Sequence, residues 1–155
     1  MERIIYFIVI AAVLVTASVF DIRNYKVNNA FSVVIAAAGI ILTVYDYVKN
    51  QRISILILAL AGAITGFIFT AIPALKGGIG GADVKIITAL GLGFGVYGIL
   101  YFLLITFLSA GLFQLIKAII KKIKTREKLD MRSKLPLVPF MLAGLTATIW
   151  QFFYK

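Results

Sequence analysis

The 155-residue sequence contains no cysteine and no histidine, and few of its side chains are charged. Without cysteine, the chain has no disulfide, no thiolate nucleophile and no cysteine-type metal site. Without histidine, it lacks the commonest general base and metal ligand of proteins. Any catalysis has to rest on other side chains, and no metal or other cofactor is expected.

Charged residues make up only 14% of the chain, whereas they make up about 25% of an average soluble domain. Hydrophobic residues make up 62%, and the mean hydropathy is +1.04. This composition predicts an integral membrane protein whose surroundings are the lipid bilayer. We attribute the formal net charge of +10 to basic cytoplasmic loops and expect no nucleic-acid partner.

Hydrophobic runs recur along the whole sequence, and a spanning helix needs about 20 largely apolar residues. We predict an all-α polytopic fold of about six transmembrane helices, with a short helix after a glycine-rich loop. One domain is expected to cover residues 1–155. The predicted segments are 4–20, 30–48, 53–75, 84–95, 96–116 and 136–154. The first segment is interpreted as a retained span rather than a cleaved signal peptide.

The basic residues fall mainly on one side of this arrangement. Six spans place loops 21–29, 76–85 and 117–135 on the same side. These loops hold two, two and eight basic residues, which is twelve of the sixteen in the chain. The positive-inside rule makes that side cytoplasmic and puts both chain ends outside. The sequence therefore predicts a multi-pass protein of the cytoplasmic (cell) membrane.

Two of the six acidic residues lie at positions that make them candidates for a catalytic role. Asp21 and Asp83 each occupy a junction between a hydrophobic segment and a cytoplasmic loop. Ionisable side chains at membrane depth are costly, so they are functional candidates by default. The other acidic residues fall in the basic loop or on the outer side: Glu2, Asp46, Glu127 and Asp130.

Each aspartate also has a plain structural interpretation. Asp21 could be an ordinary interfacial residue balanced by Arg23. Asp83 could be the N-cap of a helix that begins at Val84. However, the stretch 77–83 contains four glycines in seven residues, an entropic cost that a mere connector does not require. Close backbone approach or a mobile gate explains this stretch better.

Two carboxyl groups brought together in a partly dehydrated site share a proton. One then acts as a base toward water, while the protonated one polarises a carbonyl group. This is the chemistry of aspartyl proteases, and it needs neither cysteine, histidine nor metal. The glycine run is not a phosphate-binding P-loop, because no GK[ST] pattern follows and Asp83 would repel an anion.

The stretches around the two aspartates resemble the signatures of the type IV leader (prepilin) peptidases, which are GxGD-type intramembrane aspartyl proteases. They read Asp21-Ile22-Arg23-Asn24-Tyr25-Lys26-Val27-Asn28-Asn29 and Gly78-Ile79-Gly80-Gly81-Ala82-Asp83-Val84-Lys85. Asn28 occupies the position of the usual proline, and Ala82 replaces the glycine before the second aspartate. The resemblance is to a short form, because the cysteine-containing region of the longer, methylating members is missing.

The resemblance implies a membrane-embedded aspartyl endopeptidase, a hydrolase that removes the short leader of pilin-like (prepilin) precursors at the cytoplasmic membrane face. Such cleavage serves type IV pilus assembly and protein secretion. The resemblance assigns catalysis to Asp21 and Asp83. It assigns supporting roles to Gly78, Gly80, Gly81, Lys85 and Asn29. Lys85 is expected to act on Asp83 through its charge. The expected partners are a prepilin-like substrate and the bilayer, and the oligomeric state stays open, a homo-oligomer included.

Two other classes of protein fit the same pattern. A small ion- or proton-coupled transporter would bind a cation with the same aspartates. Transporters often carry paired repeats with broken helices in matching positions, whereas this sequence has one short segment without a counterpart. A non-catalytic membrane assembly subunit would need the aspartates only for complex formation.

Overall fold

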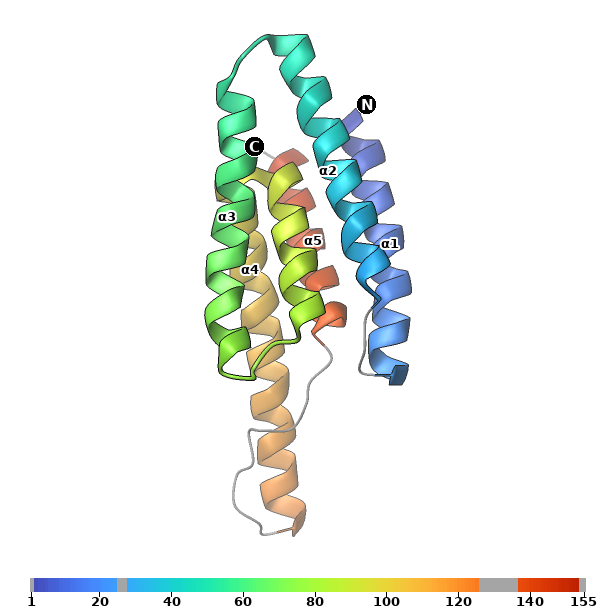
Figure 1. The fold of residues 1–155 in the computed structure, drawn as a ribbon. Helices are drawn as coiled ribbons and strands as arrows, with labels where there is room; N and C mark the ends of the chain where they lie inside the picture. Colours follow the sequence, from blue (N-terminus) through green and yellow to red (C-terminus); the bar gives the residue numbers. More distant parts are fainter. Residues whose placement is uncertain (1, 25–27, 126–136, 154–155) are drawn as a thin grey trace.

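The computed structural model describes residues 2–24, 28–125 and 137–153. Within these residues the chain forms helices and no strands, so the predicted all-α class is confirmed. The helices, shown in Figure 1, are α1 (Glu2–Asn24), α2 (Asn29–Asn50), α3 (Ser54–Leu75), α4 (Gly81–Thr125) and α5 (Val138–Phe153).

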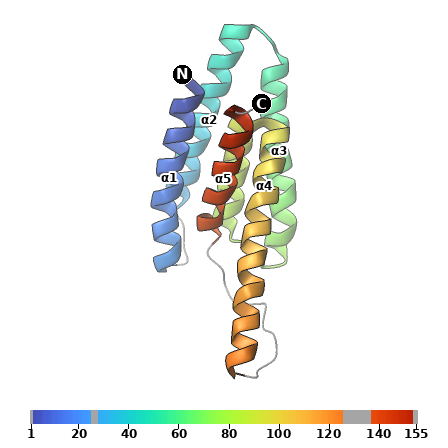
Figure 2. The same cartoon turned by 180° about the vertical axis from the view of Figure 1, so that it is seen from behind.

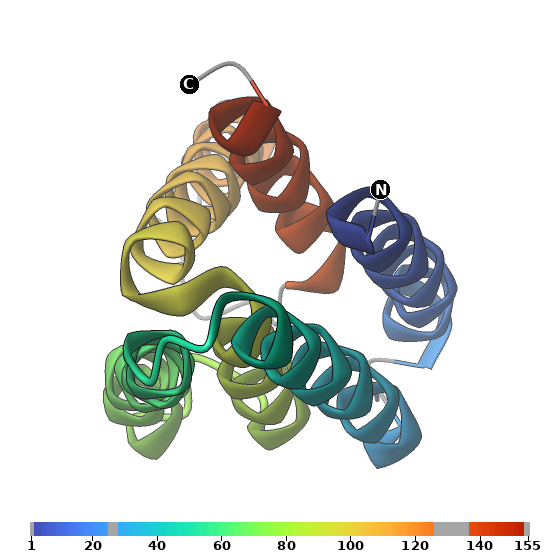
Figure 3. The same ribbon diagram turned by 90° about the horizontal axis from the view of Figure 1, so that it is seen from above.

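Helix α4 consists of two helical arms joined at a break. At Gly95 the backbone has φ 67° and ψ −175°, which is outside the helical region. Glycine adopts a positive φ without the steric cost of a Cβ atom. The chain folds back at the break, so the two arms are antiparallel (Figure 1). The first arm lies beside α2 and α3, and the second lies beside α5 (Figure 3). The short segment predicted at 84–95 corresponds to the first arm.

Four apolar helical stretches among the described residues are long enough to cross a membrane. They are Glu2–Ile22, Asn29–Asn50, Ser54–Leu75 and Gly81–Ile120. Helix α5 is apolar but has only 16 residues. The predicted number of six spans is therefore not confirmed, although the two arms of α4 match two of the six predicted segments. Several apolar helices of spanning length identify a membrane protein.

Two predicted boundaries are wrong. The loop predicted at 117–135 begins later, because the second arm of α4 continues as a helix to Thr125 and extends beyond the other helices (Figure 2). Residues 117–125 are mostly lysine and isoleucine and include no glycine or proline, which a helix accommodates. Helix α4 also starts at Gly81 rather than Val84. Residues 126–136, with Glu127 and Asp130, lie outside the described part of the chain.

Glycines bring α3 and the first arm of α4 into close contact. A Cβ atom on Gly62 would collide with the carbonyl oxygen of Gly91, and one on Gly91 would collide with that of Gly62. A Cβ atom on Gly66 would lie 3.0 Å from the carbonyl oxygen of Ile87. Small residues let helix backbones approach one another in this way. Gly62, Gly66 and Gly91 therefore serve the packing of α3 against the first arm, whereas Gly95 supplies the break.

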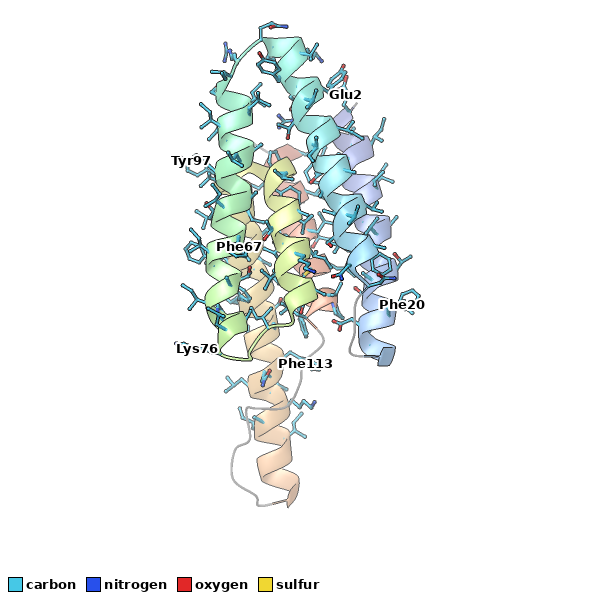
Figure 4. The ribbon with its side chains drawn as sticks, viewed as in Figure 1. Glu2, Phe20, Phe67, Lys76, Tyr97 and Phe113 are labelled. Carbon is cyan, nitrogen blue, oxygen red and sulfur yellow. The ribbon has the colours of Figure 1, made fainter. Side chains whose placement is uncertain are left out.

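The core joins α1, α4 and α5. Among its fully buried side chains are Ile10, Leu14, Leu90, Phe102, Met141 and Leu145. This packing holds the end of α1, the start of α4 and the start of α5 at one end of the bundle (Figure 1). Phe20 and Lys76 lie toward this end, and Glu2 lies toward the opposite one (Figure 4).

Candidate active site

The structure places Asp21 and Asp83 at the same end of the bundle. Asp21 lies near the end of α1, and Asp83 lies in the first turn of α4. Their side chains are buried, with exposed fractions of 6% and 8%. The two carboxyl groups are close enough for their charges to act on one another. Two buried acidic groups in one place are unfavourable for stability alone, which indicates a functional site.

Asp21 also holds the start of α5. The backbone N–H of Val138 donates a hydrogen bond to Asp21 Oδ2 at 3.1 Å. Leu137 precedes the helix, and its carbonyl accepts from Phe140 and Met141, but its apolar side chain cannot bind the free N–H groups of the first turn. Asp21 fills this capping role from another helix, in the position where the helix dipole favours a carboxylate.

Asp83 is not the N-cap that the sequence suggested as one interpretation. Helix α4 starts two residues earlier, and the N–H of Asp83 itself donates to the carbonyl of Gly80 at 3.1 Å. Its Oδ1 atom is buried and has no hydrogen-bond partner within the described residues. Buried polar atoms are almost always paired. The Asp83 carboxyl group is therefore available to a substrate or to water.

The first glycines of the loop end α3. The N–H of Gly77 donates to the carbonyl of Ala74 at 2.9 Å, and that of Gly78 donates to Pro73 at 3.0 Å. These two bonds, with φ 75° at Gly77, form a Schellman motif, which needs a residue without a Cβ atom at this position. Part of the glycine content therefore terminates a helix.

The absence of a side chain at Gly80 leaves room for the carboxyl group of Asp83. A Cβ atom on Gly80 would lie 3.1 Å from Asp83 Oδ2, which is tighter than ordinary contact. One on Gly81 would meet no atom of the described residues within 4 Å. Ala82 lies within the first turn of α4, where a Cβ atom is normal. Of the supporting glycines predicted from the sequence, Gly78 and Gly80 have close neighbours and Gly81 has none.

The two polar residues predicted to support the site contact each other. Lys85 Nζ donates to Asn29 Oδ1 at 3.1 Å, which links the start of α2 to the start of α4. In the described part of the chain Lys85 makes no ion pair with Asp83, because side chains two residues apart on a helix point in different directions. Asn28 caps α2 by accepting from the N–H of Ala30 at 3.1 Å, which a proline could not do.

A pocket of about 550 Å³ opens beside Asp83. Its walls are the glycine-rich loop, the end of α3, Leu137 before α5, and the second arm of α4. The arm contributes Phe107, Ala110, Gly111, Gln114 and Leu115. Asp83 is the one charged residue among the lining residues described. A mostly apolar pocket of this size with one convergent acidic group is typical of a ligand site.

The acidic residues at the other end of the bundle have structural partners. Asp46 forms an ion pair with Arg3 at 3.1 Å, and Tyr45 donates to Glu2 Oε1 at 2.7 Å. Lys49 lies 3.8 Å from Glu2. These contacts tie the start of α1 to the end of α2. They fit the sequence interpretation, which did not place Glu2 or Asp46 at the site.

Three components of the site were not predicted from the sequence, namely Gly111, Gln114 and the backbone N–H of Val138. A glycine and a glutamine inside an apolar run, Gly111 and Gln114, were a usable signal. The N–H of Val138 left no signal, because every residue except proline has one and only the fold brings this one to Asp21.

A bundle of apolar helices, four of which are long enough to cross a membrane, with two buried aspartates at one end places the chain among integral membrane proteins. A sequence model of the type IV leader peptidase family matches residues 8–115. The chain therefore belongs to the type IV leader peptidase family and is a protease of the leader-peptidase type. The match includes both aspartates and the glycine-rich loop and ends before α5. No curated protein and no solved structure matches the chain significantly.

Proposed function

We propose that this protein is an aspartyl endopeptidase that removes the leader of pilin-like precursors at the cytoplasmic face of the membrane. The observation that carries the proposal is the burial of Asp21 and Asp83 at one end of the bundle, with Asp83 Oδ1 unpaired beside a pocket. Among the described residues that line the pocket, Asp83 is the one side chain that offers an acid or a base.

The two carboxyl groups share one proton between them. The deprotonated carboxyl takes a proton from a water molecule while the water oxygen attacks the carbonyl carbon of the scissile peptide bond. The protonated carboxyl donates a hydrogen bond to the carbonyl oxygen of the same bond. When the carbon–nitrogen bond breaks, a proton passes from the dyad to the leaving amine, and the pair returns to its starting state.

The glycine-rich loop supports an extended substrate next to this pair. Gly78 and Gly80 line the pocket together with Asp83. Glycine carries no side chain, so a substrate backbone can approach the loop closely. The positive-inside rule supports the cytoplasmic location, because the aspartates share their end of the bundle with Lys76 and Lys85 (Figure 4).

The test is cleavage of pilin-like precursors in lipid, with the new N-terminus mapped by mass spectrometry. Asp21→Asn and Asp83→Asn are each expected to lower the cleavage rate by at least about 10³-fold, because a carboxyl pair acts as a unit. Asp46→Asn is the matched control at the opposite end and is expected to cleave normally.

Cleavage retained by either dyad variant would remove that aspartate from the mechanism. Ion flux in liposomes without cleavage by the wild type would favour the transporter alternative. Loss of complex formation alone would favour an assembly subunit.

A further inference from the structure

Gly111 lies inside the second arm of α4, where packing does not require a glycine. A Cβ atom at this position would meet no atom of the described residues within 4 Å. Every other glycine in the interior of a helix has at least one atom within that distance, and at Gly62, Gly91 and Gly144 a backbone atom would collide with the Cβ atom. A glycine in the interior of a helix is less favourable than an alanine, because it loses more conformational freedom on folding. Gly111 therefore weakens α4 without a packing reason.

The open space at Gly111 belongs to the pocket beside Asp83. Gly111 lines that pocket, as does its small neighbour Ala110. Phe107 and Gln114 lie four and three residues away along the arm, so they share its face of the helix. Asp83, whose Oδ1 atom has no partner among the described residues, lines the same pocket. The missing side chain at Gly111 thus leaves room in the pocket that Asp83 lines.

The chemistry of the walls limits what can enter. Apart from Asp83 and Gln114 the lining side chains are apolar or absent. A basic or acidic side chain would lose its hydration there without gaining enough partners, whereas an apolar side chain gains free energy by leaving water.

We propose that this pocket holds a bulky apolar side chain of the substrate next to the scissile bond, and that Gly111 sets the largest side chain that fits. The inference rests on the proposed peptidase function. Gly111 acts as a specificity-determining residue, because it touches the substrate side chain and not the reacting atoms. The basic part of a leader stays outside this pocket.

The test uses the full chain in lipid with the variants Gly111→Ala, Gly111→Val and Gly111→Leu. Two precursors are compared that differ only in one residue flanking the cleaved bond, bulky and apolar in one and alanine in the other. Each flanking position is varied in turn. A few methylene groups of misfit in an apolar pocket change kcat/KM by roughly 10–200-fold.

We expect an effect at one of the two positions that flank the cleaved bond. There, kcat/KM for the bulky precursor should fall progressively from Gly111→Ala to Gly111→Leu, and by roughly 10–100-fold in Gly111→Leu. The alanine precursor is expected to change by less than about threefold. Leu112→Ala, on a side chain that is 51% exposed and does not line the pocket, is the control and leaves both rates unchanged.

An equal loss for both precursors, or no loss for either, would overturn the inference while wild-type cleavage keeps the proposed function intact. Failure of the wild type to cleave any precursor would instead contradict the proposed function. The unfolding temperature of Gly111→Ala separates misfolding from misfit, since this variant is expected to be at least as stable as the wild type.

Discussion

Asp21 has two tasks at the scale of the single residue, and they have different chemical requirements. Catalysis needs a carboxyl group that exchanges a proton, whereas capping α5 needs only an oxygen that accepts from the N–H of Val138. The amide oxygen of asparagine can accept this hydrogen bond but cannot exchange the proton. The two tasks can therefore be separated by substitution.

Both Asp21→Asn and Asp21→Ala are expected to be inactive, but only the alanine variant should lose the cap. Loss of an N-cap costs about 1 kcal/mol. The measurement is thermal unfolding in lipid or detergent, followed through the helical circular dichroism signal. If the two variants unfold at the same temperature, the hydrogen bond to Val138 contributes nothing to stability.

At the scale of the helices, the contact of α3 with the first arm of α4 depends on missing side chains. Gly62→Ala places a methyl group against the carbonyl of Gly91, which is backbone and cannot rotate away. Such overpacking costs about 1–3 kcal/mol. The unfolding temperature of Gly62→Ala is therefore expected to fall.

Gly111→Ala provides the matched control for Gly62→Ala, because it is the same substitution at a position where the added methyl group meets no described atom within 4 Å. An equal fall in both variants would mean that the effect comes from helix interiors in general. A fall in Gly62→Ala alone assigns it to the contact between α3 and α4. This contact supports the first arm, whose first turn carries Asp83.

At the scale of the whole molecule, the absence of cysteine makes the orientation in the membrane directly measurable. Arg52→Cys and Lys76→Cys each introduce a single thiol, one in the loop between α2 and α3 and one in the loop between α3 and α4. These loops lie at opposite ends of the bundle (Figure 1).

A membrane-impermeant thiol reagent added to intact cells is expected to label Arg52→Cys. It should reach Lys76→Cys only after the membrane is permeabilised, because the positive-inside rule places the aspartate end in the cytoplasm. The reverse pattern would place the aspartates outside.

Local patterns in the sequence determined the class of the protein and its main candidates. Hydrophobic runs identified a helical membrane protein, since each spanning helix satisfies its own backbone hydrogen bonds and must be apolar over its length. Scarcity of acidic residues and the glycine-rich stretch singled out Asp21 and Asp83. The N-cap interpretation of Asp83 was wrong, because Gly81 and Ala82 already belong to the helix.

Only the tertiary structure decided what these residues touch. Asp21 and Val138 are 117 positions apart, and Asn29 and Lys85 are 56 apart. The pocket at Gly111 exists because α4 folds back at Gly95 and brings its second arm to the glycine-rich loop. Helix periodicity and local motifs act over a few residues, whereas these contacts depend on how the helices pack against one another. The sequence by itself therefore determined which side chains could act, and packing decided how they are arranged.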